Sequence, residues 1–490
     1  MRSYGFYVKK LAAGSLAMSL EKASQNLVGL VLLPIFAIYL SPEDFGILAM
    51  FTLVITALGL IYNPGTLSSA VRLYFDTEDE KRQKEIFAAA HTFFMLLPIP
   101  VTIAVVLTGE AMFSKVFTEF EFMPYGLLAV ILAFFSQPGR IWSEFMVVKY
   151  RVVPLAVTTF VAFVLGAAVS LICIVGLEMG VMGRVIGMYV MPVALFSVSL
   201  ITMQRYSGGM FRWKTMFEVV KFGLPLIGAI WAYSILQYTG SYLLERYMTM
   251  KDVGIYNIAY RLAGIPLFVT LGFRQMWTPI FYENMATRNY DVIRRLMTLF
   301  ILFMTFISGI TMLFAKEAIL LLFDARYHEA IPIVGWIVLG VFLLGILPLS
   351  NSFLGYAKKF GLTSWIALAS GVVNIILNIV LIPEFGVRGA AWTLIISYMI
   401  YLGGGIIFTY REFAKVTSFR AILMTAALFL PAILLTELTP AQQFSWAELL
   451  AKVVFLFVWS VALFKLKFLQ WSEVTGMIRA VTSRLKNGKG

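Results

Sequence analysis

Cysteine, histidine and charged residues are all scarce in this sequence. It has one cysteine, Cys173, among 490 residues, and two histidines, His91 and His328, which are far apart. A single cysteine forms no disulfide within the chain, and a metal site of His and Cys ligands lacks the clustered residues that it needs. Charged residues make up 13% of the chain, against about 25% in a soluble domain. Since the gaps between apolar stretches are also short, little sequence is left for a soluble catalytic domain, and we expect no enzyme.

What the sequence has instead is a succession of uncharged apolar stretches. Residues 23–42, 45–71, 86–109, 152–177 and 330–357 contain no Asp, Glu, Lys or Arg. About 20 helical residues cross the hydrocarbon core of a membrane, where an isolated charge costs several kcal/mol. The fold class predicted is an all-α integral membrane protein. Its fourteen spans lie near residues 11–40, 45–65, 85–108, 124–147, 153–176, 181–204, 219–246, 253–273, 292–315, 329–356, 362–382, 387–410, 420–437 and 447–466.

Basic residues collect in every second gap between the spans, whereas acidic residues occupy the alternate gaps. Arg72, Lys149 and Arg288 belong to the first set, and Asp44 and Asp252 belong to the second. Positive loops stay on the cytoplasmic side of a membrane, so we expect both termini in the cytoplasm and an uncleaved first span. Because this topology accounts for the net charge of +13, we do not expect nucleic-acid binding.

The first twelve spans contain an internal repeat. Residues 39–47 (YLSPEDFGI) reappear as 247–255 (YMTMKDVGI), residues 178–183 (EMGVMG) as 384–389 (EFGVRG), and Pro138 with Lys149 as Pro348 with Lys359. The three offsets are close to one another. Each aspartate is placed to cap the helix that follows it, and each Gly-x-x-Gly allows close helix packing. Two parallel six-span lobes suit alternating access to a site between them.

Four segments resemble the polysaccharide or O-antigen (Wzx-type) flippases of the MOP transporter superfamily. They are residues 40–46 (LSPEDFG), 222–226 (FGLPL), 253–262 (VGIYNIAYRL) and 180–183 (GVMG). The resemblance covers roughly residues 10–467 and implies two six-helix lobes in a V. We expect an N-terminal lobe over 1–210, a C-terminal lobe over 211–415, two additional spans over 416–467 and a basic cytoplasmic tail over 468–490.

The same resemblance implies a function and a location. The family moves undecaprenyl-pyrophosphate-linked oligosaccharide, a precursor of O-antigen, capsule or exopolysaccharide, from the inner to the outer leaflet of the bacterial cytoplasmic membrane. The expected partners are this cargo, membrane lipid and other polysaccharide assembly proteins. No cofactor is implied beyond coupling to H⁺ or Na⁺.

Pyrophosphate needs cations in a partly dehydrated cavity, and sugars need polar and aromatic side chains. In the first span, Glu21, Lys22, Gln25 and Asn26 form a polar stripe that must avoid lipid, facing either a cavity or a helix that the Glu–Lys pair binds. Arg261 is the first candidate phosphate ligand, because it lies about 13 Å inside its span. The other candidate cations are Arg140, Arg72 and Arg274; Arg140 has the alternative of an interfacial salt bridge with Glu144, and Arg72 and Arg274 that of topology-setting charges.

The candidate sugar-binding residues are Tyr233, Gln237, Tyr238, Asn374 and Asn378, for which helix–helix hydrogen bonding is the alternative. Glu21 and then Glu144 are the candidates for ion coupling, since both are acidic and lie within spans.

Three other functions compete with this one. A lipid II flippase shares the basic cavity and fourteen spans. A MATE-type exporter of cationic drugs shares the fold, but it favours an acidic cavity. A membrane glycosyltransferase or polymerase is disfavoured, because the outer gaps are short and the sequence contains no Asp-x-Asp.

Overall fold

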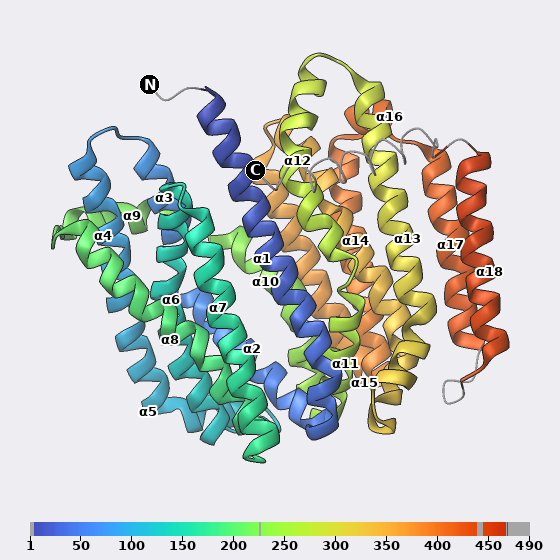
Figure 1. Ribbon diagram of the computed structural model, residues 1–490, viewed down its shortest axis with the longest axis horizontal. Helices are drawn as coiled ribbons and strands as arrows, with labels where there is room; N and C mark the ends of the chain where they lie inside the picture. Colours follow the sequence, from blue (N-terminus) through green and yellow to red (C-terminus); the bar gives the residue numbers. More distant parts are fainter. Residues whose placement is uncertain (1–3, 225–226, 439–443, 467, 469–490) are drawn as a thin grey trace, which may run out of the picture.

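The computed structural model describes residues 4–224, 227–438, 444–466 and 468, and the predicted basic tail lies outside these residues apart from Phe468. Helices form two bundles that lie side by side, with α17 and α18 at the far edge of the second (Figure 1). The first bundle contains α1 (Tyr4–Tyr39), α2 (Pro42–Tyr62), α3 (Thr66–Phe75), α4 (Glu80–Leu96), α5 (Pro98–Val116), η1 (Phe122–Gly126), α6 (Leu127–Val148), α7 (Val152–Leu171), η2 (Ile172–Gly176) and α8 (Gly180–Ser207).

The second bundle follows a short helix, α9 (Trp213–Gly223). It contains α10 (Ile227–Tyr247), α11 (Met250–Ala263), α12 (Leu267–Ala286), α13 (Tyr290–Leu322), η4 (Ala325–Ala330), α14 (Ile331–Tyr356), α15 (Phe360–Phe408) and α16 (Tyr410–Val416). The last two helices of the described chain are α17 (Phe419–Leu438) and α18 (Trp446–Lys465).

Eleven helices within the described residues are long and apolar enough to cross a membrane. One of them, Gly361–Phe408, is 48 residues long, and it reverses direction at Gly386, which has a φ of 56°. Residues 227–286, where the seventh and eighth spans are predicted, contribute none of the eleven. The all-helical membrane fold is therefore confirmed, while the count of fourteen spans stays a prediction.

Two span boundaries differ from the predictions. The predicted seventh span begins at residue 219, but α9 is a separate helix and α10 begins at Ile227. The predicted eighth span, 253–273, is interrupted after Ala263, and α12 continues to Ala286. Gly264 and Pro266 lie at this break, where proline removes a backbone donor and limits helix continuation.

The two bundles meet most closely where α2 crosses α11. A Cβ atom on Gly46 would lie 2.1 Å from the carbonyl oxygen of Met250, and one on Gly254 would lie 1.8 Å from that of Pro42. Both glycines belong to the repeated segments, so each copy of the repeat supplies the small residue that admits the other copy. Ser41 with Asp44, and Thr249 with Asp252, form capping boxes at the starts of these helices. The predicted capping role of the two aspartates is confirmed.

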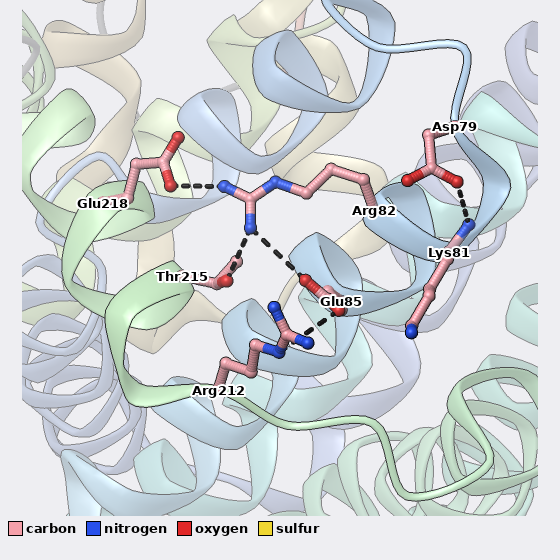
Figure 2. A network of polar contacts seen from close by, with 7 residues as sticks. All are labelled: Asp79, Lys81, Arg82, Glu85, Arg212, Thr215 and Glu218. Carbon is pink, nitrogen blue, oxygen red and sulfur yellow. Dashed lines mark hydrogen bonds and ion pairs between the residues drawn. The ribbon is translucent and has the colours of Figure 1, made fainter.

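We call this end of the bundles the acidic end, since its turns contain Glu43, Glu119 and Asp252; the opposite end is the basic end. At the basic end, Figure 2 shows a polar network between α4 and α9. The Arg82 guanidinium contacts Glu218, donates to Thr215 Oγ1 at 2.7 Å and lies 3.4 Å from Glu85, whose other oxygen is 3.4 Å from Arg212. α9, which follows the predicted lobe boundary at 210–211, therefore contacts α3 and α4 of the first bundle, and the division into lobes stays a prediction.

Candidate functional site: a cavity between the bundles

A cavity of about 730 Å³ lies between the two bundles. Its walls come from α1, α2, α6, α7 and α8 of the first bundle and from α11 and α12 of the second. Along α1 the lining runs from Gln25 to Phe36, which corresponds to about 17 Å of helix. Apolar side chains form most of the wall, and no Asp or Glu belongs to the part of it that the structure describes.

Two arginines are the charged residues of this described lining: Arg184 of α8 and Arg261 of α11. The Arg184 guanidinium donates from Nη1 to Ser170 Oγ at 2.8 Å and lies 4.9 Å from the centroid of the Phe36 ring. Arg261 is exposed to the cavity, and its side chain makes no hydrogen bond or ion pair with any described residue. The two side chains come from different bundles and carry the same charge into one cavity.

An uncompensated cation at membrane depth is costly, and such residues usually face a water-filled path or an opposite charge. Neither arginine has a carboxylate partner in the described structure. Arginine presents a planar set of donors that matches the oxygens of a phosphate group. The cavity is therefore suited to an anion that contacts both bundles at once.

Polar residues of α1 and α11 line the same cavity as the two arginines. Gln25 and Asn26 line the cavity, as does Tyr260. The Glu21 carboxylate accepts a hydrogen bond from Gln25 Nε2 at 2.6 Å and one from Thr159 Oγ1 of α7 at 2.8 Å. Of the predicted polar stripe, Gln25 and Asn26 thus reach the cavity, while Glu21 is bound to the neighbouring helix.

Comparison with known proteins assigns this chain to a family. The model of a family described as "Polysaccharide biosynthesis protein" matches residues 11–285, more than half of the chain. The chain belongs to this family. It is 24% identical over 359 residues to the succinoglycan biosynthesis transport protein ExoT of Rhizobium meliloti (strain 1021), covering 70% of this chain and 69% of that one.

Solved structures of MOP-type transporters share the fold of this family member. The lipid II flippase MurJ in an inward closed conformation superposes with a TM-score of 0.73 at 15% identity, covering 91% of this chain and 98% of that chain. An inward-facing MATE-family multidrug transporter of the MOP superfamily gives a TM-score of 0.54 at 16% identity, covering 78% and 93%. These likenesses confirm the predicted transporter-like helical fold.

A second set of the predicted residues lies outside the described lining of this cavity. Arg140 of α6 lies near Gly59 of α2, 3.6 Å from the position of an added Cβ, and near Tyr238 of α10. Lys22 of α1 interacts electrostatically with Glu144 of α6. Arg274 of α12 interacts in the same way with Tyr233 of α10. The alternative for Arg140 was a salt bridge with Glu144. No ion pair joins these two side chains in the described structure.

The remaining predicted residues have other surroundings. Asn374 and Asn378 are 2% and 1% exposed. Asn374 Nδ2 donates to Ser397 Oγ at 3.0 Å, and Asn378 Nδ2 donates to Asn374 Oδ1 at 3.0 Å, so they form the helix–helix contact that was the alternative to sugar binding. Tyr238 lines a smaller hollow of about 210 Å³ between α2 and α10, Gln237 is half-buried outside both hollows, and Arg72 pairs with Asp76 at 3.1 Å.

Arg184 is the cavity residue that sequence reasoning missed. It directly follows the repeated Gly180-Val-Met-Gly183 segment, and only its place within an apolar span distinguished it. A charge within a predicted span is a signal of function by itself. The sequence does not say which side of α8 meets the other bundle, and the cavity supplies that information.

Proposed function

We propose that this protein moves a lipid-linked oligosaccharide across the membrane by alternating access, with the pyrophosphate of the cargo bound between Arg184 and Arg261. The observation that carries the proposal is the pair of arginines in a cavity whose described lining contains no carboxylate. A diphosphate offers several anionic oxygens, so it can accept hydrogen bonds from both guanidinium groups. Its binding would replace the repulsion between the arginines with an attraction across the two bundles.

The cations near the basic end extend this site into a path. Lys22, Arg140 and Arg274 are exposed, and the nearness of Arg140 of α6 to Tyr238 of α10 supports a position for it between the bundles. We assign them the role of attracting the head group before it reaches Arg261. The sugars would contact Gln25, Asn26 and Tyr260, while the polyprenyl chain stays in lipid.

The proposed orientation places the basic end in the cytoplasm of a bacterium, with both termini on that side of the inner membrane. Cargo would then enter from the leaflet where lipid-linked oligosaccharides are assembled and leave toward the acidic end. Proteins that assemble the oligosaccharide or polymerise it are the proposed partners. Glu21 and Glu144 stay predictions as coupling residues.

A lipid II flippase is the second candidate, because its cargo carries the same pyrophosphate and MurJ shares the fold. A MATE-type exporter of cations does not fit a cavity with two arginines and no described acid.

Deletion of the gene tests the choice between these cargoes. We expect a polyprenyl-pyrophosphate-linked polysaccharide repeat unit to accumulate on the cytoplasmic face, because its synthesis continues while its translocation stops. The measurement is mass spectrometry of extracted lipid-linked sugars, with the complemented strain as control. Accumulation of lipid II would select the second candidate, and sensitivity to cationic dyes without any lipid-linked sugar would contradict both.

A further inference from the structure

A buried carboxylate joins the two bundles at the acidic end. Glu245, in the last turn of α10, is fully buried. Its Oε1 accepts hydrogen bonds from the backbone N–H groups of Thr118, Glu119 and Phe120, at 2.7, 2.7 and 3.1 Å. These three residues lie between α5 and η1, so donors and acceptor belong to different bundles. Three successive amides that converge on one charged oxygen form a strong, directional contact.

Neighbouring residues reinforce this contact. Glu119 Oε2 accepts from the backbone N–H of Met250 at 2.6 Å, at the start of α11. The Tyr242 hydroxyl donates to the carbonyl oxygen of Val116 at 3.2 Å. Arg246 Nη1 donates to Thr118 Oγ1, also at 3.2 Å. The end of α10 and the start of α11 are thus both bound to the same turn of the first bundle.

A second contact between the bundles involves the residues that correspond to Glu245 and Thr118 in the repeat. The Arg326 guanidinium, at the start of η4, donates to the carbonyl oxygens of Ala37 and Ile38 at 3.4 Å each, and the Tyr327 hydroxyl donates to that of Leu40 at 2.5 Å. Ala37 precedes Glu245, and Thr118 precedes Arg326, by the same 208 residues that relate Tyr39 to Tyr247. In both contacts the end of one bundle's first long helix meets a turn of the other bundle.

The two contacts differ in their chemistry. Arg326 is half-exposed, with 45% of its side chain accessible, and its bonds are long. Glu245 is buried, and its bonds are short and charge-assisted. Its second oxygen, Oε2, has no hydrogen-bond partner in the described structure, so water that reaches it on opening would compensate for part of the bonds lost.

We infer that Glu245 is a positioning residue that keeps the acidic end closed, and that its bonds to residues 118–120 must break before the cavity opens there. The α2–α11 crossing cannot separate while α10 is bound to the turn of the first bundle. Loss of the Glu245 carboxylate would favour the state that is open at the acidic end. This inference rests on alternating access as proposed above, but not on the identity of the cargo.

The test is the accessibility of a cysteine in the cavity. Gly29 lines the cavity, and a Cβ there meets nothing within 4 Å, so Gly29→Cys in a Cys173→Ser background gives a single reporter. A membrane-impermeant maleimide is applied to spheroplasts and to inverted vesicles. With Glu245→Ala we expect labelling from the outer side to rise at least tenfold and labelling from the cytoplasmic side to fall. Glu245→Gln should show the same change to a smaller degree, because an amide oxygen accepts the bonds without charge.

The matched control is Glu110→Ala, which removes an exposed carboxylate of α5 that has no partner in the described structure. Its labelling should equal that of the parent from both sides. Equal labelling of Glu245→Ala and Glu110→Ala would overturn the inference. If the alanine variant does not reach the membrane, Glu245→Gln decides, and parental labelling from both sides would overturn it. The assay contains no cargo, so a wrong assignment of the cargo leaves its result unchanged.

Discussion

Replacing Arg261 by alanine is expected to lower transport about 100-fold while leaving the amount of folded protein unchanged. Hydrogen bonds to charged groups contribute roughly 1.5–3 kcal/mol each. A loss of about 3 kcal/mol, from the bidentate contact with phosphate, corresponds to about 100-fold. Folding should not suffer, because the Arg261 side chain makes no hydrogen bond or ion pair with the described residues.

The measurement for this variant is transport of lipid-linked oligosaccharide in the deletion strain, normalised to protein in the membrane. Arg261→Lys keeps the charge without the planar donor set, so it should fall between alanine and the wild type. Arg205→Ala is the charge-matched control, since Arg205 is exposed near the basic end of α8 and does not line the cavity. Wild-type transport by Arg261→Ala would remove the proposed phosphate ligand.

The second large effect concerns four buried charges between α13 and α18. Lys452 Nζ lies 2.6 Å from Glu317 and 2.6 Å from Glu448, and Lys316 Nζ lies 2.6 Å from Glu448. The exposed fractions of these side chains are 1% for Lys452, 5% for Lys316, 8% for Glu317 and 12% for Glu448. The two positive and two negative charges balance only while all four are present.

Lys452→Met is therefore expected to destabilise the protein by about 3–5 kcal/mol, because it leaves Glu317 buried without a counter-charge. A thermal melt in detergent measures the change as a fall in Tm. Replacing the pair together, Glu317→Leu with Lys452→Met, should recover most of the loss, since no isolated charge remains. Lys465→Met on the exposed end of α18 is the control. Equal melting of Lys452→Met and Lys465→Met would show that the four charges do not anchor α18.

Much of the architecture could be predicted because a membrane restricts which residues a spanning helix can contain. Charge exclusion places the spans, and a repeat offset near 208 residues relates the two halves. The same offset reappears in the structure at the Gly46–Gly254 crossing and at the contacts of Glu245 and Arg326. The predicted seventh span, 219–246, corresponds to the end of α9 and to α10, because α9 ends at Gly223 and α10 begins at Ile227.

The site was only partly predictable, since depth within a span does not fix the direction of a side chain. Arg261 was predicted from its depth within a span and lines the cavity, whereas Arg184, which lines it too, was not predicted. Asn374 and Asn378 had the spacing of a binding face, yet they point at each other and at Ser397. Glu245 binds backbone amides more than 120 residues away, and no side-chain pattern marks such a partner.

Translocation by the purified protein in liposomes tests the central claim most directly. The substrate is a labelled oligosaccharide on a polyprenyl pyrophosphate, and the comparison is the same sugar on a polyprenyl monophosphate. Two arginines from opposite bundles predict faster movement of the pyrophosphate form, by at least tenfold, and loss of this preference in Arg261→Ala. Movement no faster than in protein-free liposomes, or equal rates for the two lipids, would contradict the account.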